Sequence, residues 1–350
     1  MNLHSLRLDK TSHLGEPEFN DLVPSRYALR VGQIDVMVIS GGVLPLPAAT
    51  LATNADPAAL AAWLEERLLP PDVFTWALNV AVVRSGDRTI LIDAGIGGEY
   101  PELPAGRLAL RLDAAGIDPA SVTDVVLTHL HIDHVGGLLA DGLMDRLRPE
   151  VPIHLAAAEV EFWKAPDFSR TAMPAPMPDM IRLTASRFLD AYRSQLRPFE
   201  EEYEVAPGVV VARTGGHTPG HSVVRLASGG DRLTFLGDAV FPDHFDRPDW
   251  YNAFDHDPRR RFASGWVSCE NWRPPATRRW PRTCRSRPSA GWQSTAMSFV
   301  GRRPIGSTNR LLAGWRTWPP PCPVSKKAAH QKFINDMSAL RALQNWNIYP

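Results

Sequence analysis

The chain has 350 residues, of which 44% are hydrophobic, and its 38 basic and 38 acidic side chains balance to a formal net charge of zero. This composition is ordinary for a soluble globular protein of one large domain or two. No apolar run approaches the ~20 residues that a membrane span needs, and the first residues lack the apolar core of a signal peptide. Three cysteines, Cys269, Cys284 and Cys322, suggest neither a disulfide framework nor a zinc knuckle. We therefore expect a cytoplasmic protein without a membrane partner.

Apolar periodicity predicts the order of the elements. Residues 1–29 are polar and aperiodic, which predicts an arm that lies over the domain or is disordered. Asp56-Pro57 predicts the start of a helix, because a carboxylate can cap the first turn and proline fits there. Runs with a period of two predict strands, and helical spacing predicts helices. The strands are expected at 33–40, 76–83, 89–92, 124–127, 151–155, 209–213, 222–226 and 232–236, and the further helices at 103–115, 156–164 and 182–196.

The order of these elements predicts the fold class. The strands fall into two blocks, each followed by helices, which favours an α+β fold with sheet packed on sheet and helices outside. Residues 166–180 contain four prolines and three methionines, and we expect them to form a loop across the site described next.

The stretch from His129 to His134 reads His-Leu-His-Ile-Asp-His and directly follows the strand predicted at 124–127. Three imidazoles and a carboxylate form the ligand set that a divalent ion such as zinc prefers. In an extended segment His129 and His131 point to one side, and Asp133 and His134 then turn toward a second position. Gly136-Gly137 would let the backbone turn sharply into the next element. The pattern predicts a metal site rather than a surface cluster of histidines.

This stretch resembles the signature of the metallo-β-lactamase superfamily. Three more segments extend the resemblance: Leu91-Ile92-Asp93-Ala94-Gly95, Gly216-His217-Thr218-Pro219-Gly220-His221-Ser222 and Phe235-Leu236-Gly237-Asp238-Ala239. Within the superfamily, the residues of these loops and their spacing are most similar to those of the branch of N-acyl-homoserine lactonases and methyl-parathion-hydrolase-like enzymes. The resemblance implies an αβ/βα four-layer sandwich over residues 30–257.

The resemblance also implies how the site residues divide their roles. His129, His131 and His217 would hold one metal ion, Asp133 and His134 a second, and Asp238 would bridge the two. Two zinc ions are the implied cofactor, with manganese, iron or cobalt as alternatives. They would share a hydroxide that attacks the substrate, with Asp133 and Asp238 as the catalytic residues.

Several neighbouring residues have weaker signals. Asp93 would either accept the N–H of a ligating histidine or cap a turn. His221, four residues after His217, would either neighbour the metal ligands or, as we expect, be a structural, hydrogen-bonding histidine at a strand start. The aromatic-rich segment with Phe241, His244, Trp250 and Phe254 predicts a substrate pocket that suits an acyl chain or an aryl ester.

One ligand of the family is missing at its usual place, some dozens of residues past the bridging aspartate. After Asp238 the chain has only His244, His256 and His330. The first two come too early. The second metal position is therefore incompletely ligated, completed by an unexpected histidine, or absent.

The leading hypothesis for function is a metal-dependent hydrolase of a small ester, lactone or organophosphate. A glyoxalase-II-like thioesterase shares the metal motifs but would need a basic pocket for glutathione. An inactive remnant is a further alternative. A nucleic-acid-binding or nuclease member is suggested by the basic tail with its interleaved tryptophans, although the acidic domain at 30–257 argues against a nucleic-acid partner. A small-molecule substrate is the expected partner, and a homodimer stays open.

From Pro258 onward the composition changes. Residues 258–350 contain 17 Lys plus Arg and two acids, so the other residues carry a net charge of about −15. The same span holds seven of the 11 tryptophans. No period lasts more than a turn or two, which predicts an irregular Arg/Pro/Trp-rich tail. Three interpretations compete: a basic appendage that binds nucleic acid, a disordered tail, and the product of a shifted reading frame.

Overall fold

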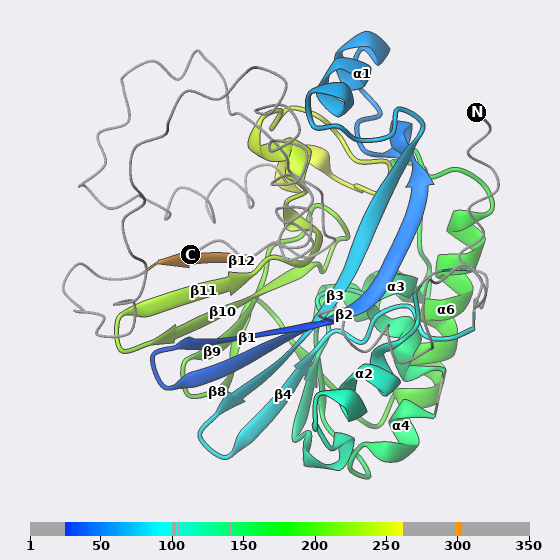
Figure 1. The fold of residues 1–350 in the computed structure, drawn as a ribbon. Coiled ribbons are helices and arrows are strands. Elements are labelled where there is room, and N and C mark those ends of the chain that lie inside the picture. The colour runs from blue at the N-terminus through cyan, green and yellow to red at the C-terminus, as the bar shows by residue number, and fades with distance from the viewer. Residues whose placement is uncertain (1–24, 100–102, 104, 141, 262–298, 303–350) are drawn as a thin grey trace, which may run out of the picture.

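Two β-sheets organise the fold of the computed structural model, which describes residues 25–99, 103, 105–140, 142–261 and 299–302 (Figure 1). The seven-stranded sheet has its strands in chain order: β1 (Arg26–Val31), β2 (Ile34–Pro47), β3 (Val73–Ser85), β4 (Arg88–Ile92), β5 (Asp124–Val126), β6 (Ile153–Ala156) and β7 (Leu196–Phe199). The five-stranded sheet has the order β12 (Phe299–Arg302), β11 (Asp231–Phe235), β10 (Ser222–Ser228), β9 (Val209–Arg213) and β8 (Glu202–Ala206). Strands β4 to β7 pair in parallel, and all other pairs are antiparallel.

Alternate residues of the central strands enter two different cores. Val82 and Leu91 belong to the core beneath the helices, whereas Val83 and Ile90 belong to the core between the two sheets. Successive side chains of a strand point to opposite faces, so a strand buried on both faces must be apolar throughout. This explains the apolar runs at residues 80–83 of β3 and 90–92 of β4.

Helices cover the outer face of the seven-stranded sheet (Figure 1). They are α2 (Leu108–Ala114), α3 (Ile132–Val135), α4 (Leu143–Arg146), α5 (Ala157–Lys164) and α6 (Met177–Tyr192), while α1 (Pro57–Glu66) lies near the end of the long β2–β3 pair. Asp56 caps α1, because its carboxylate accepts a hydrogen bond from Ala59 N at 3.0 Å. Within the described ranges no helix is long and apolar enough to span a bilayer.

Some elements differ from the sequence-based prediction. Strand β1 begins at Arg26, inside the predicted arm, and pairs with β2; residues 1–24 lie outside the described residues. Helix α6 begins at Met177, within the predicted loop, because Pro178 in the first turn costs no hydrogen bond. It ends at Tyr192, and β7 and β8 follow where no strand was predicted.

The span predicted to be irregular contributes one strand. β12 pairs antiparallel with β11, with Phe299 opposite Phe235 and Arg302 opposite Arg232. The prediction of a tail without regular structure was therefore wrong at residues 299–302. Residues 262–298 and 303–350 lie outside the described residues.

Candidate metal centre

The motif residues converge where strands of both sheets end. Asp93 follows β4, His129 follows β5, His217 precedes β10, and Asp238 follows β11. These strands lie close together in the fold, so segments more than a hundred residues apart in the chain meet at one point. The sandwich thereby builds a polar site at an edge of an apolar core.

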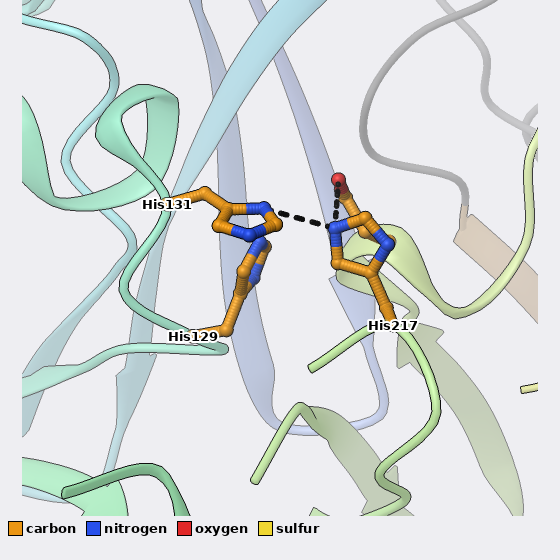
Figure 2. Close-up of side chains that lie close together, drawn as sticks. His129, His131 and His217 are labelled. Atoms are coloured by element: carbon orange, nitrogen blue, oxygen red, sulfur yellow. Dashed lines mark hydrogen bonds and ion pairs between the residues drawn. The ribbon is translucent and has the colours of Figure 1, made fainter. Parts of the chain in front are cut away.

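Four side chains form a compact donor cluster. The ligand atoms of His129, His131, His217 and Asp238 all lie within 4.8 Å of one another, and all four residues are buried. His217 Nε2 lies 3.0 Å from His131 Nδ1 and 3.2 Å from Asp238 Oδ2. Figure 2 shows the three imidazoles turned toward one another, with a dashed line joining His131 and His217.

Asp133 and His134 lie on the other side of Asp238. His134 Nε2 is 3.3 Å from Asp238 Oδ1 and 3.5 Å from Asp133 Oδ2. Asp238 thus faces His217 with Oδ2 and His134 with Oδ1, so each of its carboxylate oxygens lies near a different imidazole.

The donor set fits a divalent metal ion. His129 Nε2, His134 Nε2 and Asp238 Oδ1 are buried and have no hydrogen-bond partner in the described part of the chain. Buried polar atoms without a partner are rare in native proteins. Imidazole nitrogen and carboxylate oxygen are atoms that a zinc-like ion binds, so one bound cation would satisfy several of them together.

Hydrogen bonds at Nδ1 leave the Nε2 atoms of His134 and His129 facing the cluster. His134 Nδ1 donates to Asp93 Oδ2 at 2.8 Å, and Thr128 donates its backbone N–H and its hydroxyl to the same carboxylate. The oxygen of that hydroxyl lies 3.1 Å from His129 Nδ1 and can accept its proton. Such bonds fix the tautomer and orientation of a ligating histidine.

Asp255 fixes the orientation of His217 in the same way, by a contact with Nδ1. Its Oδ1 lies 3.0 Å from His217 Nδ1, and its Oδ2 accepts from Arg261 Nε at 2.8 Å. Asp255 and Arg261 are almost completely buried. The sequence analysis did not single out Asp255, because a lone carboxylate in a loop carries no distinctive spacing.

Glu159, which the sequence analysis also missed, joins the two histidine loops. Its Oε1 accepts from Leu130 N at 3.1 Å and from Trp163 Nε1 at 2.7 Å, and its Oε2 accepts from Thr218 Oγ1 at 2.6 Å and Gly220 N at 2.9 Å. Leu130 lies between His129 and His131, and Thr218 follows His217. One buried carboxylate therefore holds both loops in register. An acid on a short helix has no sequence signal for this role.

His221 is fully buried and contacts Asp238 through the backbone N–H of that residue. Its Nε2 accepts from Asp238 N at 3.0 Å, and its Nδ1 lies 2.8 Å from Thr214 Oγ1. With both ring nitrogens engaged, His221 offers no free lone pair to a cation.

Burial and neighbouring charges set the protonation of the cluster. Burial, together with the nearby imidazoles, lowers the pKa of His129 well below its ordinary value. Burial also lowers the pKa of His134, but Asp133, Asp238 and Asp93 outweigh it and raise the pKa well above that of a free imidazole. The same balance, with Asp238 and Asp255 as the acids, raises the pKa of His217 to about 9. Carboxylates that stabilise a proton here would also stabilise a bound cation.

A pocket opens beside this cluster. Its wall includes His131, Asp133 and Asp238, and its apolar part consists mainly of Leu44, Leu46, Trp76, Met177, Phe241 and Phe254. The empty space, including the open mouth, is about 430 Å³. Of the predicted pocket residues, Phe241 and Phe254 line it, whereas His244 and Trp250 are not part of the wall.

Neither described histidine that follows Asp238 joins the donor cluster. His244 Nδ1 accepts from Phe241 N at 2.9 Å and lies 2.9 Å from Arg261 Nη1. The ring of His256 packs against Phe162 with 4.8 Å between the ring centroids. His330 lies outside the described residues. Within those residues, Asp133, His134 and Asp238 are the donors that lie where the sequence predicts a second metal ion.

Comparisons with known proteins identify the family and several relatives of the chain. A family model described as the metallo-beta-lactamase superfamily matches residues 75–294. The Drosophila melanogaster beta-lactamase-like protein 2 homolog is 30% identical over 172 residues, which are 48% of this chain and 51% of that protein. An N-acyl homoserine lactonase of a Bacillus species is 25% identical over 151 residues, 43% of this chain and 51% of its own length. The chain thus spans about half the length of the curated relatives it matches.

Two solved structures show the same fold at low sequence identity. The dizinc quorum-quenching lactonase AidC superposes with a TM-score of 0.65 at 22% identity and covers 71% of this chain and 87% of its own. The hydrolase AbOPH has a TM-score of 0.60 at 24% identity, covering 71% and 86%. The predicted two-sheet α+β fold is confirmed. With a family model that matches well over half of its length, this chain belongs to the metallo-β-lactamase superfamily.

Proposed function

We propose that this protein is a metal-dependent hydrolase of a small ester, lactone or organophosphate. The observation that carries the proposal is the set of buried, unpartnered imidazole and carboxylate atoms beside an apolar pocket. His129, His131, His217 and Asp238 would hold one zinc-like ion. His134 and Asp133, with Asp238, offer donors for a second.

A divalent ion in such a site lowers the pKa of water toward ~7 and polarises a carbonyl or phosphoryl oxygen. The chain's own residues supply the rest. Asp133 lines the pocket and its side chain keeps 16% exposure, so it can accept a proton from the attacking water and return it to the leaving oxygen. Trp76, Phe241 and Phe254 would bind the apolar part of the substrate and exclude bulk water.

The pocket chemistry favours an uncharged, apolar substrate over the alternatives. Among the described residues of its wall there is no Lys or Arg, whereas glutathione and nucleic acid both bring negative charge. Asp133 and Asp238 would repel such groups further. The relatives include a lactonase and the fold neighbours a lactonase and a hydrolase, which supports the same substrate classes for this chain.

Metal content tests the site. We expect the purified protein to contain zinc or a similar ion, and His131→Ala or Asp238→Ala to lower its affinity at least ~10-fold, because cutting a hydrogen bond to a ligand alone costs that much. His154→Ala is the control, since that buried histidine pairs with Asp124 away from the cluster. A wild type free of metal, whose melting temperature added zinc does not change, would exclude the proposed site.

Activity is tested with a lactone, an aryl ester and a paraoxon-type phosphotriester. Asp238→Asn should remove nearly all hydrolysis, because a neutral amide holds a cation more weakly than a carboxylate does. Equal rates for this variant and the wild type would place any observed hydrolysis outside this site.

A further inference from the structure

One buried guanidinium lies between the metal cluster and the segment that supplies part of the pocket wall. Arg261 is only 1% exposed, so its charge and its N–H groups need partners within the protein. Its Nε donates to Asp255 Oδ2 at 2.8 Å and its Nη2 donates to Trp250 O at 3.1 Å, while Nη1 lies 2.9 Å from His244 Nδ1. Each nitrogen of the guanidinium therefore contacts a different residue.

The contact at Nε leads to the metal cluster. The carboxylate of Asp255 accepts from Arg261 with Oδ2, and its Oδ1 lies 3.0 Å from His217 Nδ1. The backbone makes a second contact in the same direction, because a Cβ on Gly216 would lie only 2.3 Å from Arg261 N. Arg261 thus packs on the residue before His217 and holds the carboxylate that contacts the ring of His217. Although Arg261 stands within the basic span 258–350, these contacts join it to the domain.

The contact at Nη1 leads to the pocket wall. His244 Nδ1 accepts from Phe241 N at 2.9 Å, and Phe241 lines the pocket. Because Nδ1 accepts from that N–H it carries no proton, and it can share its lone pair with Arg261 Nη1. The backbone N–H of Asn252, another residue of the wall, donates to Asp255 Oδ2 at 3.1 Å. Arg261 thereby connects two parts of the pocket wall with the carboxylate beside the metal cluster.

We propose that Arg261 is a positioning residue that fixes His217 and the pocket wall relative to one another. This inference rests on the proposed metal centre and hydrolase function, and it adds the residue that joins metal site and pocket. A planar guanidinium carries several donors in fixed directions, whereas an ammonium group is a single point of charge. A lysine at this position would keep the charge but could not hold Asp255, His244 and Trp250 O together.

Arg261→Lys tests the contact with the metal cluster. We expect zinc to bind ~10-fold more weakly or worse, because the loss of a contact behind a metal ligand typically costs that much. The visible spectrum of the cobalt-substituted protein should also change, because its bands follow the geometry of the ligands. Arg67→Lys is the matched control. Arg67 is also buried, at 7% exposure, but it pairs with Asp246 and Trp63 O, which do not belong to the donor cluster. This control should keep the wild-type zinc affinity and spectrum.

Two variants of His244 test the contact with the pocket wall and leave Arg261 and Asp255 in place. His244→Leu removes the acceptor that Phe241 N and Arg261 Nη1 share, whereas His244→Asn puts an amide oxygen close to the position of Nδ1. We expect His244→Leu to change the cobalt spectrum and to weaken zinc binding ~3-fold or more. His244→Asn should keep the wild-type spectrum. If Arg261→Lys changes the spectrum and His244→Leu does not, the link to the pocket wall is overturned.

Folding and hydrolysis are measured beside the spectra. If Arg261→Lys and His244→Leu are less stable in urea but keep the zinc affinity and the cobalt spectrum, Arg261 serves folding alone and the positioning role is refuted, while the hydrolase proposal stands. If Arg261→Lys does not fold, the two His244 variants decide. A protein that shows the expected changes in zinc affinity and spectrum but hydrolyses no lactone, aryl ester or phosphotriester would refute the hydrolase and retain the positioning role of Arg261.

Discussion

At the scale of single residues, three buried acids fix the donors of the candidate centre. Asp93, Glu159 and Asp255 each accept N–H groups from the segments that carry the cluster. Asp93 does so from a left-handed backbone conformation, with φ +56, which is unusual for a residue other than glycine. Its hydrogen bonds to Thr128 and His134 hold it there. Such a conformation is typical of functional sites, where the surrounding structure offsets the strain.

Glu159→Gln tests whether this acid positions the two histidine loops. An amide NH₂ must face one pair of donors, so at least one hydrogen bond is lost, at a cost of about 1–3 kcal/mol. We expect lower stability in urea and at least ~10-fold weaker zinc binding, with a changed visible spectrum of the cobalt-substituted protein. Glu161→Gln on the same helix is the control, because Glu161 is exposed and pairs with Lys164. If Glu159→Gln lowers stability but leaves the zinc affinity and the cobalt spectrum unchanged, Glu159 has a purely structural role.

Asp243 makes stability depend on pH. Neither of its carboxylate oxygens has a hydrogen-bond partner among the described residues, and burial raises the pKa of Asp243 well above its ordinary value despite the nearby Arg261. From about pH 4 upward the unfolded chain releases this proton and the folded chain retains it, so stability falls as pH rises, by about 1.4 kcal/mol per pH unit until the folded pKa is reached.

Asp243→Asn should therefore be more stable than the wild type at pH 8, and the difference should shrink toward pH 5. Urea unfolding at the two pH values measures it. Asp190→Asn, at an exposed position of α6, should show no such trend. A stability difference for Asp243→Asn that is the same at both pH values would contradict the raised pKa.

At the scale of elements, the pair Gly136-Gly137 has a different role from the predicted sharp turn. Gly136 has ordinary helical φ and ψ of −58° and −34°. A Cβ on Gly137 would lie 2.0 Å from Ala94 O, and one on Gly136 would lie 2.2 Å from Ile96 O. The glycines are needed because α3 and the turn after it pack directly on the backbone that follows β4. The same contact includes Ala94 N donating to His134 O at 2.8 Å.

Gly137→Ala should therefore destabilise the fold by about 1–3 kcal/mol through overpacking, and also weaken zinc binding, because Asp93 and His134 would move apart. Gly86→Ala is the comparison. Gly86 has φ +60 with open space around it, so alanine there costs about 1–2 kcal/mol from backbone strain alone and should leave zinc affinity unchanged. If both variants bind zinc like the wild type, the close approach at Gly137 has no influence on the centre.

The elements that sequence could predict are those whose signals are local. Asp56 marks the start of α1, and the apolar runs mark β3, β4 and β5. Strand β7 reads Leu-Arg-Pro-Phe and lies at the edge of its sheet, where a proline is tolerated but the pattern is weak. The histidines and Asp238 stand in contiguous motifs. Asp255 and Glu159 reach the histidine segments only through the tertiary fold, so no spacing in the sequence reveals them.

At the scale of the whole molecule, residues 258–350 differ in charge and composition from the rest of the chain. The family model matches as far as residue 294, and β12 pairs with β11 at the edge of the second sheet. Yet residues 258–350 contain two acids, Glu270 and Asp336, against 17 basic residues. The last histidine that the family places on the second metal is also not found at its expected place.

We predict that the chain from about Pro258 onward is read in a frame shifted from that of its ancestral gene. Ala296-Met297 must be encoded by GCN-ATG, and with C as the third base the overlapping triplet is CAT, a histidine codon. A one-base shift would then place histidine about 58 residues past Asp238, where the last ligand is expected.

Restoring that frame should replace the Arg/Pro/Trp-rich segment with periodic apolar sequence and a normal share of acids. The restored protein should bind a second metal ion at Asp133, His134 and Asp238, which elemental analysis would measure as a rise from one ion to two. The gene sequence provides the first test of the frameshift. If neither of its two other reading frames gives a histidine near position 296 within a periodic, acid-containing segment, the tail is a genuine appendage and its basic charge has another cause.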